Sequence, residues 1–153
     1  MRRKDKEITE RSVLETIITN SVICRLAFVH GNRPYMVPLN FGYCDNTLYF
    51  HSAPVGKKIE IIKTNPNVCF ELDNNTVLVE AEVACAWSMK YQSVIGFGKA
   101  CLIEDDLEKH TALNIIMQHY SGRDFYVPET ELLRVAVFKV EIESMTGKQS
   151  GQL

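Results

Sequence analysis

The hydrophobic residues of this chain fall into short alternating or continuous runs that are separated by turn-forming residues. Such runs are typical of β-strands, whereas apolar residues three and four positions apart indicate helices. Many strands with few crossovers favour a mainly β fold of the α+β class, a small antiparallel barrel with peripheral helices. Helices are predicted at residues 10–19, 55–63 and 105–122. About seven strands are predicted, at residues 22–29, 35–43, 48–51, 68–72, 77–87, 92–103 and 132–143.

Two of the predicted helices carry end signals. Ser12 and Glu15 form a capping-box pattern at the start of the first helix. Asp105, three residues before Glu108, is placed to cap the third helix, and Gly122 is placed to end it.

Three segments depart from the regular pattern. Pro38 lies inside a predicted strand and cannot donate a ladder hydrogen bond, so it indicates an edge strand, a bulge or a backbone that faces a ligand. Residues 73–75 are predicted to form a turn between two strands. Residues 145–153 contain Gly147 and Gly151 and are expected to form a flexible C-terminal tail.

The composition is that of a single soluble domain, and we expect residues 1–153 to fold as one unit with its own core. A net charge of −2 gives no reason to expect a nucleic-acid partner. No apolar run reaches the roughly 18 residues of a membrane span. The charged N-terminus is not followed by the apolar stretch of a signal peptide. We therefore expect a cytoplasmic protein that binds neither membranes nor nucleic acid.

The cysteines give no sign of a disulfide framework or a metal site. Their number is odd, none forms a C-x-x-C pair, and each sits in a strand-like apolar context. Reduced and mostly buried thiols are therefore expected, and no metal ligand set is predicted. The cysteines are Cys24, Cys44, Cys69, Cys85 and Cys101.

The junction between the third predicted strand and the second predicted helix carries the strongest functional signal. Pro54 suits the first position of a helix, Ser52 can cap it, and Gly56 allows a ligand to approach the backbone. Lys57 and Lys58 add two charges to the unpaired N–H groups of a helix start. This combination predicts an anion pocket for a phosphate group. An ordinary helix start with solvated lysines is the alternative.

No motif of a hydrolytic triad, a zinc protease, a P-loop or a dinucleotide-binding turn is present. His51 is the candidate catalytic residue because it ends a strand beside the predicted anion pocket. A structural hydrogen-bonding role is the alternative for this residue. His30, His110 and His119 are expected to be solvated.

Several segments, taken in order, resemble the flavin-binding split barrels related to pyridoxamine 5′-phosphate oxidase. The resemblance is greatest to the branch that includes nitroimidazole-resistance nitroreductases. The substrate-phosphate arginine and histidine set of a true pyridoxamine phosphate oxidase is not found, which argues against oxidation of vitamin B6. The resembling segments cover nearly the whole chain and are residues 33–41, 48–53, 56–58, 65–71, 96–100 and 146–151.

The resemblance implies a six-stranded split barrel that binds FMN in a groove between the two subunits of a homodimer. Ser52, Lys57 and Lys58 would hold the phosphate, and the backbone of the strand that contains Pro38 would face the isoalloxazine ring. The full set of cofactor-contacting positions implied by the resemblance is Val37, Pro38, Leu39, Asn40, His51, Ser52, Ala53, Gly56, Lys57, Lys58, Tyr91, Gln92, Ser93 and Lys148.

Two functions are compatible with this reading. The first is an FMN-dependent oxidoreductase that passes electrons from NADH or NADPH through FMN to a small aromatic or nitro compound. In such an enzyme the cofactor carries the chemistry and the protein supplies position and polarity. The second is a non-catalytic flavin or haem binder, such as a redox sensor or storage protein, because fold alone does not decide function.

Overall fold

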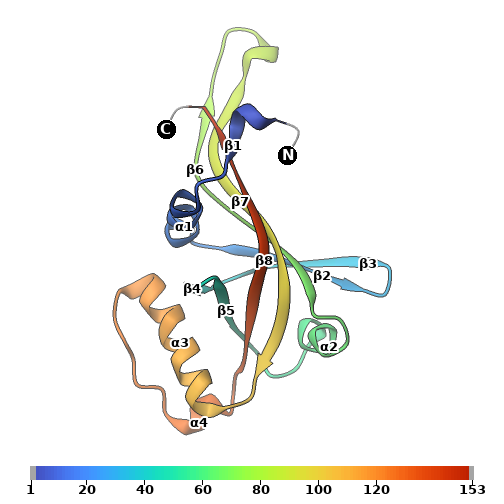
Figure 1. Ribbon diagram of the computed structural model, residues 1–153, viewed down its shortest axis with the longest axis vertical. Coiled ribbons are helices and arrows are strands. Elements are labelled where there is room, and N and C mark those ends of the chain that lie inside the picture. The colour runs from blue at the N-terminus through green and yellow to red at the C-terminus, as the bar shows by residue number, and fades with distance from the viewer. Residues whose placement is uncertain (1–2, 152–153) are drawn as a thin grey trace.

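The computed structural model describes residues 3–151, whose strands form one curved sheet with helices packed around it (Figure 1). The strands are β1 Glu7–Ile8, β2 Cys24–His30, β3 Arg33–Leu39, β4 Gly42–Cys44, β5 Thr47–Ser52, β6 Asn67–Val79, β7 Ser88–Ile103 and β8 Ala136–Ser150. The α-helices are α1 Arg11–Asn20, α2 Lys57–Thr64, α3 Asp106–Ser121 and α4 Glu129–Leu132, and single 3₁₀ turns occur at Lys4–Lys6 and Ala84–Ala86.

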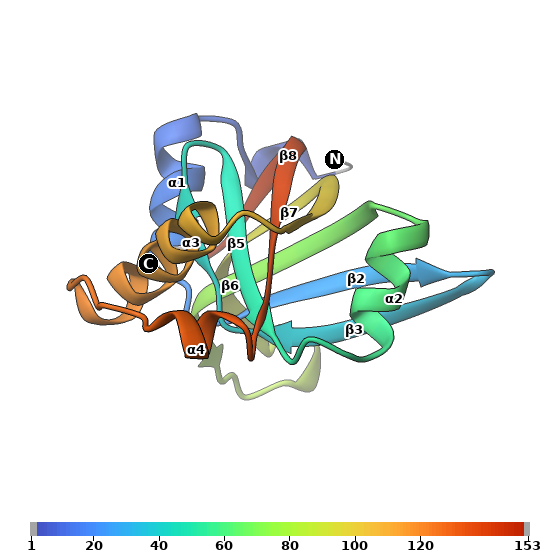
Figure 2. The ribbon, with the colours of Figure 1, turned by 90° about the horizontal axis from the view of Figure 1, so that it is seen from below.

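The sheet has the strand order β3-β2-β6-β7-β8-β5-β4, and β1 pairs with β8. All of these neighbours are antiparallel, which confirms the predicted mainly β, α+β architecture. The two views together show the sheet wrapping around an interior, with α2 near one end of it and α1 and α3 to the other side (Figures 1 and 2). Within residues 3–151, none of the helices has the length and hydropathy needed to cross a bilayer.

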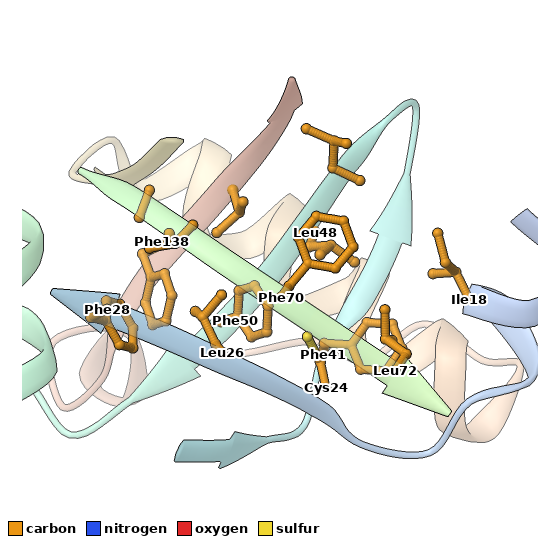
Figure 3. Packing of buried hydrophobic residues seen from close by; sticks show 14 of the residues in the cluster. Ile18, Cys24, Leu26, Phe28, Phe41, Leu48, Phe50, Phe70, Leu72 and Phe138 are labelled. Carbon is orange, nitrogen blue, oxygen red and sulfur yellow. The ribbon is translucent and has the colours of Figure 1, made fainter. Parts of the chain in front are cut away.

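The barrel interior is filled by alternate residues of the strands, as the two-residue period of a strand requires. Phe28 of β2, Phe70 of β6 and Phe138 of β8 have no exposed surface. The Phe50 and Phe138 rings stack with centroids 5.1 Å apart. Full burial of one such side chain contributes about 1.5–3 kcal/mol, so this cluster, shown in Figure 3, accounts for much of the stability.

Helix α3 packs mainly on β4 and β5, and a second small core forms where it meets β7 and β8. Its start is capped as predicted, because the Asp105 carboxylate accepts a hydrogen bond of 2.9 Å from Glu108 N. Its end is also as predicted, since Gly122 takes a left-handed conformation with φ of 65°. The second core is made of Ile103, Ala112 and Val137, with Tyr49, Leu113 and Val135 packed against it.

Two strand predictions are wrong in their boundaries. The strand predicted at 35–43 is divided into β3 and β4 by residues 40–41, where the Phe41 ring is buried and its N–H donates to the Tyr120 hydroxyl at 3.0 Å instead of to a strand. The turn predicted at 73–75 is a bulge inside β6, with Asn75 at φ of 54°. Strand β6 therefore continues to Val79, and the reversal of the chain lies at residues 80–87.

The prediction of a flexible C-terminal tail is also wrong for the part of it that the structure describes. Strand β8 continues to Ser150, paired with β7 along its length and with β1 near its end. Gly147 is buried so tightly that an added Cβ would lie 2.3 Å from the Leu14 side chain. Residues 152 and 153 lie outside the described part of the chain.

Two further predictions about side chains need correction. All five cysteines are free, but Cys85 and Cys101 are exposed rather than buried. His119 is not simply solvated, because its Nε2 lies 2.8 Å from the Ser21 carbonyl oxygen. His110 is also held in the structure, where its Nε2 accepts a hydrogen bond of 3.4 Å from Val127 N.

Candidate functional site

The start of α2 presents backbone N–H groups that no turn of the helix uses. Gly56 is the N-cap residue, and its carbonyl oxygen accepts from Ile59 N at 3.0 Å and from Glu60 N at 3.2 Å. The N–H groups of Lys57 and Lys58 precede these first helical hydrogen bonds. Gly56 has φ of 135°, which is strained for any residue with a side chain, and its Cβ position opens onto free space.

Two details of the predicted helix start are wrong. Pro54 is not the first helical residue, because the helix begins at Lys57 and Pro54 lies in the loop before it. Ser52 does not cap the helix, since it ends β5 opposite Ala136 and its hydroxyl donates to Ala53 O at 2.8 Å.

The two lysines beside these N–H groups form no salt bridge with any carboxylate of residues 3–151. Lys57 is exposed, and its Nζ lies 4.8 Å from the centroid of the Tyr35 ring. Lys58 is half-buried. The Lys57–Tyr35 contact ties the start of α2 to β3, and the uncompensated charges make this corner of the molecule receptive to an anion.

Strand β3 lies at an edge of the sheet and pairs with β2 alone among the described strands. This arrangement confirms that Pro38, which lies opposite Arg25, indicates an edge strand. Because hydrogen-bonded pairs alternate along an antiparallel ladder, Val37 and Leu39 on either side of Pro38 face β2, and the outer edge of β3, with the backbone of Met36 and Pro38, is free to meet a ligand or another chain. Asn40 follows the strand and is exposed.

His51 is one of the residues that line an apolar cavity of about 270 Å³ between β5 and α3. Burial, and secondarily the positive charge of Lys58, lowers the pKa of the His51 imidazole from its ordinary value. The ring is therefore neutral at neutral pH, so it can donate or accept a hydrogen bond without carrying charge. The other residues of the cavity wall are Leu113, Ile116, Met117, Phe125, Val127, Glu131 and Val135.

A second group of predicted cofactor residues lies together on β7 and β8. Ser93 is directly opposite Lys148, and the Lys148 Nζ lies 5.4 Å from the centroid of the Tyr91 ring. Gln92 donates a hydrogen bond of 3.1 Å to Gln149. These residues form a half-buried polar cluster with a cation at its edge.

The structure does not bring the two groups together within one chain. Ser52 is opposite Ala136 at the start of β8, whereas Ser93 is opposite Lys148 near its end. From position 136 to position 148 the strand advances twelve residues, which is roughly 40 Å of chain. A single site that used both groups would have to take them from different subunits.

Sequence reasoning missed the cavity beside His51. The three- and four-residue spacing of Leu113, Ile116 and Met117 indicates only that they share one face of a helix, and they do lie on one face of α3. The loop that brings Phe125 and Val127 back against this face has no regular hydrophobic period, so the sequence offered no signal for the enclosure.

The comparisons with known proteins agree with this geometry. A family model described as pyridoxamine 5′-phosphate oxidase matches residues 10–149. A crystal structure described as a candidate 5-nitroimidazole antibiotic resistance protein from Bacteroides thetaiotaomicron is 39% identical, with a TM-score of 0.84 over 94% of this chain and 86% of that one. An FAD-binding protein from Mesorhizobium loti is 25% identical, with a TM-score of 0.69 over 93% of this chain and 96% of that one.

One curated relative, an uncharacterised protein of Rhizobium meliloti, is 29% identical over 65 residues, which is 42% of each chain. The chain thus spans less than half of the length of this relative. The family match and the structural neighbours confirm the split-barrel fold. The chain belongs to the pyridoxamine 5′-phosphate oxidase family, whose members bind flavin, and it is similar to a candidate nitroimidazole-resistance protein.

Proposed function

We propose that the protein is an FMN-dependent oxidoreductase that works as a homodimer. It would pass electrons from NADH or NADPH through FMN to a small aromatic or nitro compound. The observation that carries this proposal is the anion-receptive start of α2 beside the free edge of β3, in a chain of a flavin-binding family.

The residues at this corner fit the terminal phosphate of FMN. The phosphate would take the N–H groups of Lys57 and Lys58 and the charges of both side chains, a combination suited to a dianion. Gly56 leaves the approach open, because no atom lies within 4 Å of where a Cβ would be. The backbone of β3 would give the flat ring polar groups that no other described strand occupies.

Bound FMN supplies the electron-transfer chemistry, and the chain positions it. His51 would donate or accept one hydrogen bond next to residues 52–58 while remaining uncharged, since the pKa of its imidazole is lowered by burial and by Lys58. The apolar cavity beside it would exclude water from the substrate side. Neutral His51 adds no positive charge to this region, which suits an uncharged acceptor compound.

The outer face of the sheet supports a homodimer. Met36, Ile95 and Phe97 are exposed there to 59%, 46% and 57%. The charged side chains on the same face are paired within the chain, Arg25 with Glu71 at 2.9 Å and Lys99 with Glu143 at 3.4 Å. An apolar face whose charges are already balanced suits contact with a second copy of itself, because like patches meet in a two-fold interface.

The test begins with the purified protein and the absorption spectrum of its bound cofactor. We expect a yellow protein that releases FMN on denaturation, as identified by mass, and whose absorption bleaches with NADH or NADPH and recovers on addition of a nitroaromatic compound. A released FAD would overturn the assignment of FMN. A flavin that no nicotinamide bleaches, or a haem Soret band, would favour the non-catalytic binder.

A further inference from the structure

After α3 the chain turns back along the helix towards α4, and residues 123–127 form a strap without regular structure (Figure 1). Gly122, with φ of 65°, makes the reversal. Within residues 3–151, the backbone of the strap forms no hydrogen bond with another backbone group. The position of the strap therefore depends on contacts with side chains.

Two side chains of α3 hold the backbone of the strap. The Asn114 Oδ1 atom accepts a hydrogen bond of 2.7 Å from Phe125 N. The His110 Nε2 atom lies 3.4 Å from Val127 N, which donates to it. His110 and Asn114 are four residues apart and therefore share one face of the helix. Both anchors of the strap thus lie next to each other on α3.

The strap closes the cavity that His51 lines. Phe125 and Val127 both belong to the cavity wall, and Met117 of α3 belongs to it as well. The two strap residues whose N–H groups are anchored are therefore the two whose side chains enclose the cavity. Release of these N–H groups would withdraw this part of the wall.

The two anchors compete for His110. Because Phe125 N can only donate, the oxygen of the Asn114 amide must face it, and the amide nitrogen then faces His110 Nδ1 at 3.3 Å. Val127 N is a second donor, at the other ring nitrogen. A neutral imidazole has one acceptor nitrogen and accepts from one of these donors at a time, whereas an imidazolium accepts from neither.

Protonation of His110 therefore removes both anchors of the strap. Val127 N loses its acceptor, because Nε2 now carries a proton. The Asn114 amide gains a partner if it turns its oxygen towards the protonated Nδ1, but this turn takes the oxygen away from Phe125 N. The imidazolium thus favours an arrangement in which the strap has no hydrogen bond to either residue.

The surroundings of His110 offer no charge that would oppose this change. No carboxylate of residues 3–151 lies within 4 Å of a His110 nitrogen. The Tyr126 ring faces the imidazole with centroids 6.3 Å apart. On α3 itself, Lys109 is paired with Asp106 at 3.1 Å. The remaining titratable or charged groups on the surrounding elements are Tyr49, His51, Glu108, Arg123, Asp124, Glu129, Glu131, Arg134 and Lys139.

We propose that the strap is a pH-controlled gate of the cavity, which neutral His110 keeps closed and protonated His110 opens. This inference goes beyond the proposed function, because it concerns access to the cavity and needs no bound flavin. A compound held in the cavity would accordingly exchange with solvent faster in mildly acidic solution than at neutral pH.

Hydrogen exchange of the strap amides, followed by NMR at pH 7.5 and pH 5, tests the anchors. This range spans the titration of an ordinary histidine, near 6.5. After correction for the intrinsic exchange rate, the protection of Phe125 N and Val127 N should fall about threefold to tenfold at pH 5, the loss expected for one hydrogen bond. Asn65 N, which donates to Ile61 O at the end of α2, is the control and should keep its protection. Unchanged protection of both strap amides would overturn the inference.

Two variants assign the effect to His110. His110→Gln supplies an acceptor oxygen at both pH values and keeps His51, so the strap should stay equally protected at pH 7.5 and pH 5. Asn114→Asp offers one oxygen to Phe125 N and one to the protonated His110, so Phe125 N should stay protected at pH 5 while Val127 N does not. Thermal unfolding confirms that both variants are folded. A loss of protection at pH 5 that persists in His110→Gln would overturn the inference.

Oxidation of Met117 by hydrogen peroxide, measured by mass spectrometry, tests whether the cavity opens. In the natural protein Met117 should be oxidised several times faster at pH 5 than at pH 7.5, and in His110→Gln the two rates should be equal. Met36, which is 59% exposed and lies on β3, is the control and should react at the same rate at both pH values. Strap amides that lose protection while the oxidation of Met117 stays constant would show that the strap is not a gate.

Discussion

The inside and the outside of this sheet differ in how many of their apolar and charged groups find partners within one chain. On the inside, Phe28, Phe70 and Phe138 have no exposed surface and the apolar residues cover one another. On the outside, Phe97 and Trp87 are about half exposed, β3 has a free edge, and the lysines of α2 have no acidic partner among the described residues. The inside therefore determines stability, and the outside is prepared for groups that this chain does not supply.

The largest expected effect comes from truncating a side chain in the core of the barrel. Phe70→Ala should lower the free energy of unfolding by about 3–5 kcal/mol, because it leaves a cavity in a closely packed core. Leu78→Ala, a truncation in the exposed hairpin between β6 and β7, should change it by about 0.5 kcal/mol or less. Urea unfolding of the flavin-free protein at low concentration measures both. Similar losses for the two variants would contradict the division between inside and outside.

The next effect concerns the lysines on the outside. Changing Lys57 and Lys58 together to alanine removes about two charge-assisted contacts, each worth roughly 1.5–3 kcal/mol. FMN affinity should then fall about a hundredfold or more, while the melting temperature of the flavin-free protein should fall only slightly, through loss of the exposed Lys57–Tyr35 contact.

Riboflavin, which lacks the phosphate, is the control for this experiment. Its affinity should change little when both lysines are replaced, because it offers no group for them to hold. Equal losses for FMN and riboflavin, measured by isothermal titration, would show that the lysines act elsewhere.

His51 belongs to both sides of the comparison, because it is part of barrel strand β5 but lines a cavity on the outside of the sheet. If it acts on the substrate, His51→Ala should slow turnover per bound flavin about tenfold to a thousandfold and leave FMN binding intact. If it is a structural group, the same change should lower the melting temperature or release FMN at unchanged turnover per flavin. Turnover normalised to flavin content, measured beside thermal unfolding, distinguishes the two roles.

The smallest effect is a dependence of stability on pH. In the unfolded chain the His51 imidazole titrates near 6.5, and in the folded protein burial and Lys58 lower its pKa. As the pH falls below about 6.5 the unfolded state binds the proton first, so stability is lost until the folded pKa is reached. His51→Gln should reduce this slope in melting experiments between pH 7 and pH 5, and an unchanged slope would assign it to other groups.

Local signals in the sequence predicted those parts of the fold that depend on neighbours in the chain. The capping residue Asp105 and the terminating Gly122 set the ends of α3 as expected. Pro38 indicated an edge strand for a reason that holds at the level of one residue, its missing N–H. The basic start of α2 was also visible, because its lysines and its glycine are adjacent.

Features that depend on distant strands were not predicted. Residues 73–75 have the composition of a turn, but pairing with β7 on both sides keeps them in one strand with a bulge. Gly147 made the end of the chain look flexible, yet its lack of a side chain is what lets Leu14 of α1 pack against β8. The separation of Ser52 from Ser93 likewise follows from strand register, which no local pattern encodes.

The position of β8 has a consequence for the order in which the protein is made. This strand is the last of the described strands in the sequence, yet it lies within the sheet, between β7 and β5. While the ribosome is still adding residues before Ala136, β5 and β7 have no strand between them and the barrel cannot close. The emerging chain therefore carries open strand edges until β8 has left the exit tunnel, and such edges are prone to pair with other chains.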